Sequence, residues 1–206
     1  KYHQGVRLVG DRKKLLNDEL LTYDGNIVRH WKQITHRRNS DGQVLYPKYF
    51  QYLGLLFTEL YLDRFFRDDE ALLRDLNNYR EEFNAGMTSQ QKNQNGQLFP
   101  DGLPTDIQVK GFEKADLKKL AYWSATGSGK TLMMHINILQ YQHYLAKSGK
   151  LRDINRIILL TPNEGLSKQH RDEFHLSGLD AELFNKDSGR LFTGQSIEII
   201  DIHKLK

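Results

Sequence analysis

Eight consecutive residues, 124–131, have the types and spacing of a loop that binds phosphate. Their sequence is Ser-Ala-Thr-Gly-Ser-Gly-Lys-Thr. Gly127 and Gly129 lack a Cβ atom, so the backbone can turn tightly and point its N–H groups inward. A helix that starts directly after the loop adds the positive end of its dipole. The sequence therefore predicts a site for the phosphates of a nucleotide.

The side chains of this loop have separate parts in the predicted chemistry. Lys130 is expected to reach the β- and γ-phosphates as the catalytic residue, and the Thr131 hydroxyl is expected to hold Mg²⁺. The expected nucleotide contacts are Thr126, Gly127, Ser128, Gly129, Lys130 and Thr131. A hydrogen bond to a charged group contributes about 1.5–3 kcal/mol, so a handful of them is enough for binding. The expected cofactors are ATP and Mg²⁺.

Two flanking segments are predicted to position the loop. Residues 120–123 are apolar, which favours a strand leading into it. Residues 132–144 have helical periodicity, and Ser148 and Gly149 then end the pattern. The apolar side chains of this helix are expected to pack on a sheet; they are Met133, Ile136, Leu139 and Tyr144.

The remaining second half alternates between strand and helix patterns. A strand is expected over residues 154–161, because residues 157–160 are continuously apolar, as in a parallel sheet. A helix is expected over residues 164–174, and strands over residues 179–184 and 197–205, the last running into a helix start. This order predicts an α/β fold with a parallel sheet.

The first half has the periodicity of helices. We expect helices over residues 11–24 and 27–38, separated by an Asp-Gly-Asn break. The strongest pattern covers residues 47–66. Its expected core residues are Phe50, Leu53, Phe57, Leu60, Tyr61 and Phe65. Another helix is expected over residues 68–83, ended by the Ala-Gly pair that follows.

A domain boundary is expected near the middle of the chain. Residues 88–99 are rich in Gln, Asn and Ser, so we expect a flexible loop there. The boundary divides a helical N-terminal region, residues 1–104, from the first part of an ATPase domain, residues 105–206. A short strand is expected at residues 107–110.

Composition excludes several classes of site. The 206 residues include no cysteine, which rules out disulfides and thiolate metal sites. His135 and His143 have no third ligand beside them, so a metal site is not predicted there. The net charge of +4 is spread along the chain and by itself favours a solvated surface over a nucleic-acid site. No segment has the length and apolarity of a membrane span, and we expect a cytoplasmic protein.

The loop departs from the general phosphate-loop pattern, because Ser stands at position 124 where that pattern has Gly. In this form it resembles superfamily 2 helicases and translocases. Residues 120–123 and 134–137 look closest to the motor subunits of type I and type III restriction enzymes. The resemblance implies a RecA-like P-loop NTPase sheet, ATP-driven movement on double-stranded DNA, and partner subunits or domains for modification or cleavage.

Two other segments resemble motifs of the same superfamily. Thr161, Pro162 and Asn163 look like its motif Ia, which implies contact with the DNA backbone. The alternative is an ordinary helix cap, because Asn163 is a good cap residue. The Phe50–Gln51 pair resembles an aromatic-Gln motif whose amide reads adenine, although it lies unusually far from Lys130.

The acidic pair that such an ATPase needs is not found at a strand end. Asp172 and Glu173 follow polar, helical residues, so we reject them. Asp201 ends a predicted strand but has no Glu after it. We therefore expect the chain to be a piece of a longer protein, with the acidic pair and a second motor domain beyond Lys206, and almost no hydrolysis by the piece alone.

Other functions stay open at this point. One is a P-loop ATPase or kinase that does not act on nucleic acid, with Asp201 as its metal ligand. Another is a nucleotide-binding interaction module, in which residues 1–104 dock a partner. A nuclease is not favoured, because Asp101 is the one acidic residue in the faint motif formed with Pro100, Gln108 and Lys110.

Overall fold

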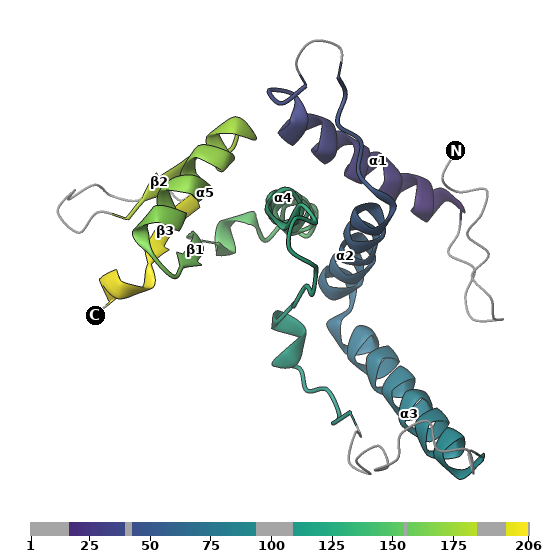
Figure 1. Cartoon of the computed structure of the whole chain (residues 1–206). Helices are drawn as coiled ribbons and strands as arrows, with labels where there is room; N and C mark the ends of the chain where they lie inside the picture. Colours follow the sequence, from purple (N-terminus) through teal and green to yellow (C-terminus); the bar gives the residue numbers. More distant parts are fainter. Residues whose placement is uncertain (1–16, 40–42, 94–108, 155, 185–196, 206) are drawn as a thin grey trace. The chain divides into compact units, whose positions relative to one another are not determined.

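The computed structural model describes residues 17–39, 43–93, 109–154, 156–184 and 197–205 (Figure 1). The chain forms two compact units. One combines Lys1–Leu62 with Ser124–Lys206, and the other is Asp63–Trp123. The boundary predicted after residue 104 lies outside the described residues and stays a prediction.

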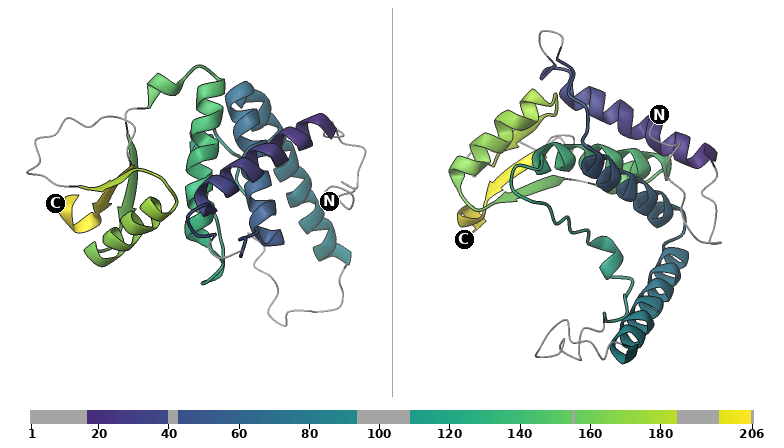
Figure 2. Two further views of the ribbon diagram at one scale, coloured as in Figure 1. Left: turned by 90° about the horizontal axis from the view of Figure 1, so that it is seen from above. Right: turned by 45° about the vertical axis from the view of Figure 1, so that its right-hand side comes forward.

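Three helices form the helical layer of the first unit. They are α1 (Asn17–Thr35), α2 (Tyr49–Arg67), whose residues up to Leu62 belong to this unit, and α4 (Lys130–Lys147). Their shared apolar cluster consists of Ile27, Trp31, Ile34, Tyr52, Leu55, Ile136 and Leu139. Figure 2 shows α1 crossing α4, with which it is in contact, so the N-terminal helices and the helix after the loop have one core.

Helix α1 is continuous where two helices were predicted. Its buried face comprises Tyr23, Ile27, Trp31 and Ile34. Gly25 costs a helix about 1 kcal/mol relative to alanine, which is less than the roughly 1.5–3 kcal/mol gained by burying one large apolar side chain. The flanking polar residues also have partners: Tyr52 donates to Asp24 at 2.8 Å, and Asn26 donates to Glu59 at 3.1 Å. The Asp-Gly-Asn sequence therefore does not break the helix.

Helix α2 buries a different face from the predicted one. Tyr52, Leu55 and Leu62 are buried, whereas Phe50 and Phe57 are 46% and 65% exposed. The helix carries apolar residues all round, so the spacing of its apolar residues alone could not select the face.

No helix in the described part of the chain is long and apolar enough to cross a membrane.

Helix α4 lies between two apolar clusters. Ile136 and Leu139 face α1 and α2, and not the sheet as predicted. Met134 and Ile138 instead pack on the sheet side, against a cluster that includes Phe174. Figure 1 shows α4 end-on, with α1 and α2 on one side and the sheet on the other. The helix that follows the loop is therefore held from both sides.

In the described part of the chain the sheet has three parallel strands, in the order β1-β3-β2. The strands are β1 (Ile157–Thr161), β2 (Ala181–Leu183) and β3 (Ile197–Asp201), with α5 (Glu164–Leu176) packed on one face. The short helices η3 (Leu151–Asp153) and η4 (Ile202–Leu205) flank β1 and β3. This arrangement confirms the α/β class and is compatible with an incomplete RecA-like sheet.

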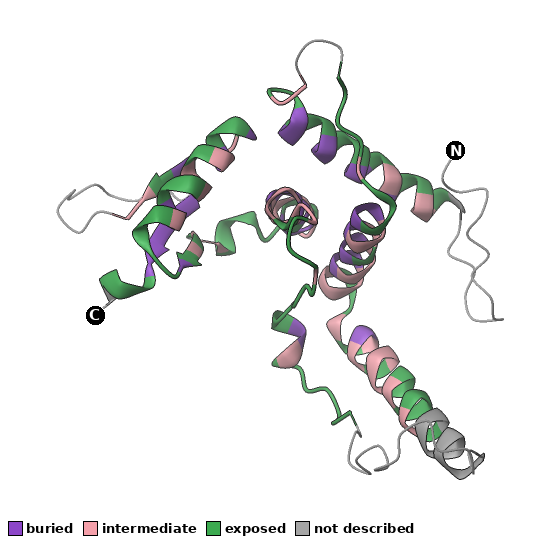
Figure 3. Cartoon of the chain, in the orientation of Figure 1, coloured by how far each residue is buried: buried purple, intermediate pink, exposed green. Residues whose placement is uncertain are grey.

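The middle strand and the edge strand differ in burial. Strand β3 is buried along its whole length, as Figure 3 shows. On β1, Ile158 and Leu160 are 50% and 54% exposed, although the continuous apolar run predicted burial on both faces. The difference follows from position, because β1 has a neighbouring strand on one side only within the described sheet.

The second unit contains α3 (Asp69–Asn93) and η2 (Asp116–Lys118). Helix α3 does not end at the predicted Ala-Gly pair but continues through residues 88–93, where a loop was predicted. A single glycine costs too little to stop a long helix. Residues 94–99, the rest of that predicted loop, lie outside the described residues, as do Pro100, Asp101 and Gln108.

An extended segment, residues 109–113, is bound to α3 by two asparagines. Asn77 exchanges two hydrogen bonds with the backbone of Phe112, at 2.8 and 3.0 Å. Asn84 does the same with Val109, at 3.1 and 3.0 Å. Seven helical residues rise about 10.5 Å, close to the roughly 10 Å of three extended residues, so both pairs fit together. The strand predicted at residues 107–110 is absent from the described part, since side chains already satisfy Val109.

Candidate nucleotide-binding site

The loop before α4 has the backbone conformation of an anion site. Gly127 and Gly129 have φ values of 76° and 80°, in the left-handed region that favours glycine. The first hydrogen bond of α4 runs from the Met133 N–H to the Gly129 carbonyl at 3.2 Å, and no side chain caps the helix. The N–H groups before Met133 therefore have no helical acceptor, and the positive end of the helix dipole lies with them.

Lys130 bends back over the loop. Its Nζ atom donates to the carbonyls of Ser124 and Ala125, both at 3.0 Å. The Ser128 hydroxyl is buried without a hydrogen-bond partner. An orphaned hydroxyl, an ammonium group and free N–H groups fit a triphosphate, and the Thr131 side chain directly follows Lys130.

The strand predicted at residues 120–123 is not formed. Leu120 and Tyr122 are 47% and 43% exposed, and Trp123 is fully exposed. The described sheet provides no partner for this segment, so its backbone has no ladder to join. The loop is consequently attached to the fold through α4 and not through a strand.

Gln51 contacts the loop from α2. Its side chain is buried; Oε1 accepts from the Lys48 N–H at 2.8 Å, and Nε2 donates to the Ser128 carbonyl at 2.7 Å. A Cβ atom at Gly129 would lie 2.5 Å from that Nε2. The structure thus brings Gln51 to the predicted nucleotide residues across 77 positions of sequence. The bond to Lys48 resembles half of a capping box, a sequence signal for the helix start but not for the contact with the loop.

Thr161, Pro162 and Asn163 form the turn between β1 and α5. Thr161 is buried, and its hydroxyl lies 2.6 Å from that of Ser167. Asn163 caps α5, with its Oδ1 accepting from the Leu166 N–H at 2.9 Å. Pro162 and Asn163 are exposed at the positive end of α5. The turn therefore offers a surface to an anion, while its two polar side chains support the turn itself.

The acidic residues considered in the sequence have structural partners. Glu173 lies near the end of α5 and pairs with Arg38 at 2.5 Å, so it does not emerge from a strand. Asp201 ends β3, and its Oδ1 accepts from the His203 N–H at 3.0 Å. Among the described residues, no group of three or more His, Cys, Asp or Glu side chains could hold a metal ion. Thr131, and Asp201 in the alternative function, stay predictions as Mg²⁺ ligands.

Comparison with known proteins adds one finding. The family model described as "Type III restriction enzyme, res subunit" matches residues 73–205, which is more than half of the chain. The match includes the loop, α4 and all three strands, and it starts after α1 and Gln51. No curated protein and no solved structure matches the chain.

Proposed function

Because the chain belongs to the type III restriction enzyme res subunit family, we propose that it is the nucleotide-binding part of an ATP-driven motor that moves on double-stranded DNA. The observation that supports this most is the loop itself, with two left-handed glycines and Lys130 at the free N-terminus of α4. The residues that bind ATP are Thr126, Gly127, Ser128, Gly129, Lys130 and Thr131.

The chain's own groups have defined tasks in this proposal. The N–H groups at the start of α4 surround the phosphates, and Lys130 exchanges the Ser124 and Ala125 carbonyls for phosphate oxygens. The Thr131 hydroxyl binds Mg²⁺, which neutralises phosphate charge when it is present. Thr161, Pro162 and Asn163 contact the DNA backbone at the positive end of α5, a contact that does not read sequence. Modification or cleavage subunits are the expected partners.

The function is tested by DNA binding and ATP hydrolysis of the complete protein. We expect DNA to stimulate hydrolysis, and the logarithm of the DNA affinity to fall linearly with the logarithm of salt concentration, because counterions are released from the phosphates. ATPase activity that ignores DNA, with no salt-dependent affinity, would favour an ATPase or kinase that does not act on nucleic acid. Nucleotide binding without hydrolysis would favour an interaction module.

Gln51 is proposed to read adenine in addition to holding the loop. After its two protein contacts the amide keeps one lone pair and one N–H, the acceptor and donor that an adenine edge requires. We expect Gln51→Ala to weaken ATP binding about fivefold and GTP binding less, since one buried hydrogen bond contributes about 1 kcal/mol. Titration with both nucleotides measures the ratio. Equal losses for ATP and GTP would mean that Gln51 supports the loop without reading the base.

A further inference from the structure

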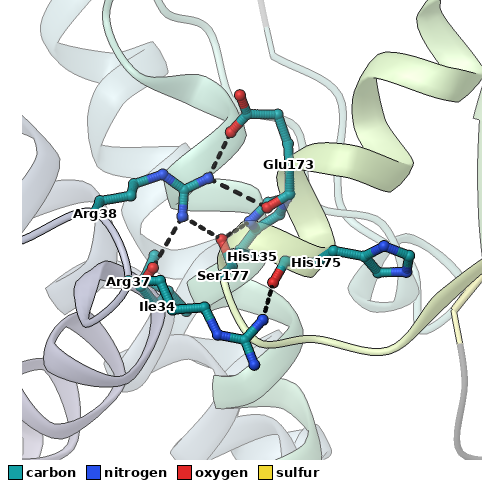
Figure 4. A network of polar contacts seen from close by, with 7 residues as sticks. All are labelled: Ile34, Arg37, Arg38, His135, Glu173, His175 and Ser177. Atoms are coloured by element: carbon teal, nitrogen blue, oxygen red, sulfur yellow. Dashed lines mark hydrogen bonds and ion pairs between the residues drawn. The ribbon is translucent and has the colours of Figure 1, made fainter.

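A partly buried polar cluster joins three helices at the end of α1 (Figure 4). The Arg38 guanidinium donates to four oxygens and is 11% exposed. Its acceptors are the Ile34 carbonyl, the Ser177 hydroxyl, and the carbonyl and carboxylate of Glu173, at 2.9, 2.7, 3.2 and 2.5 Å. Arg38 therefore attaches the end of α1 to the end of α5.

Ser177 connects this contact to α4. Its hydroxyl lies 2.7 Å from Arg38 and 2.7 Å from Nδ1 of His135, and both Ser177 and His135 are fully buried. The His135 ring also stacks on Phe174 of α5, with centroids 4.2 Å apart. Because these polar groups are inaccessible to water, moving α5 against α4 would leave them unpaired, at a cost of about 1–3 kcal/mol each.

The two helices joined here each have a predicted ligand site at the N-terminal end. His135 follows Lys130 by five residues, so about 8 Å of helix separates the cluster from the loop. Ser177 follows Asn163 by 14 residues, or about 21 Å of α5. At that far end, the contact between Thr161 and Ser167 fixes the start of α5 to β1. The connection between the sites thus consists of rigid elements and one partly buried polar cluster.

We propose that Arg38 is a positioning residue that couples ATP binding at the loop to DNA binding at residues 161–163. It does so by locking the end of α5 to α4 through Ser177 and His135. This inference rests on the proposed function, because it needs both ligands. It gives the N-terminal helix α1 a part in the motor, although α1 precedes the range matched by the family model.

The test is a linkage measurement on the complete protein. The affinity of a non-hydrolysable ATP analogue is measured with and without saturating double-stranded DNA of mixed sequence, and the ratio is the coupling factor. We expect a wild-type factor of about five or more, and factors within about twofold of one for Arg38→Ala and Ser177→Ala. Ser177→Ala removes one buried hydroxyl and leaves the Arg38–Glu173 pair. Its coupling factor can therefore be measured even if Arg38→Ala does not fold.

Arg37→Ala is the matched control. Arg37 is the neighbouring arginine, is exposed, and donates to the His175 carbonyl at 2.5 Å without reaching Ser177. It should leave the coupling factor unchanged, and analogue affinity without DNA should change less than about twofold in every variant. Wild-type coupling retained in Arg38→Ala and Ser177→Ala, or lost equally in Arg37→Ala, would overturn the inference. If the wild-type protein binds both ligands without coupling, the coupling inference is overturned and the proposed function stands. If it binds neither ATP nor DNA, the proposed function is refuted as well.

Discussion

Replacing Lys130 by alanine is expected to abolish ATP binding. In the structure the Lys130 ammonium already lies across the loop, 3.0 Å from two carbonyls, and it is the one charged group in residues 124–131. Each charge-assisted bond to a phosphate contributes about 1.5–3 kcal/mol, so losing two of them weakens binding by a factor of about a hundred or more. Calorimetric titration with ATP and Mg²⁺ measures this loss directly.

A second lysine variant, just beyond the C-terminal end of α4, distinguishes loss of the phosphate contact from a general effect of removing positive charge. Lys150→Ala removes an exposed lysine from the turn after α4 and should leave ATP affinity unchanged within about twofold. Unchanged ATP affinity in Lys130→Ala would mean that this loop is not the ATP-binding site. The far-ultraviolet circular dichroism of both variants should match the wild type, because both side chains are exposed.

The loop could be predicted because its signal is local. Two glycines followed by Lys and Thr determine the backbone turn and the helix start within a few residues, and the structure has both glycines at positive φ. Strands β1 and β3 were also predictable from short apolar patterns, and the start of α5 from its local cap, Asn163. The match with the res subunit family confirms the resemblance that these residues indicated.

The wrong predictions for helices α1 and α2 have a common physical cause, which is packing between residues that are far apart in the sequence. Gly25 stays helical because the apolar face of α1 is buried against α4. Nothing near Gly25 in the sequence indicates this contact. Helix α2 buries Gln51 and Glu59 because distant partners satisfy them; Glu59 accepts from Gln140 at 2.8 Å and from Tyr144 at 2.6 Å. A polar residue on an apolar helix predicts exposure only when such partners are absent.

The same reasoning applies to the arginines that end α1. Arg37 and Arg38 directly follow α1, and both donate to carbonyls near the C-terminal end of α5. Both carbonyls also accept a backbone N–H, from Ser177 and Gly178 at 3.0 Å, and a cation near a helix C-terminus is favoured by the dipole. The contact spans 135 positions of sequence, so no local pattern could reveal it. Contacts of this length connect the helical region to the loop and the sheet.

Acid is expected to destabilise the first unit through two buried histidines. Burial lowers the pKa of His135 to about 3, with Arg38 and His170 adding to the shift. Burial likewise lowers the pKa of His30 to about 4, with contributions from Arg29 and His143. In the unfolded chain both imidazoles have pKa values near 6.5. Below that pH the imidazoles of the unfolded chain bind protons, whereas those of the folded chain stay neutral. The free energy of unfolding is therefore highest above pH 6.5 and falls on acidification.

The size of this effect can be measured by urea unfolding at several pH values. At pH 5 each histidine should lower the free energy of unfolding by about 2 kcal/mol relative to pH 7.5. Fluorescence of Trp31, which is buried beside His30, reports the transition. The double variant His30→Leu, His135→Asn should lose most of the dependence between pH 7 and 4, whereas His36→Asn, at an exposed histidine, should keep it. An unchanged pH dependence in the double variant would mean that other groups cause the acid sensitivity.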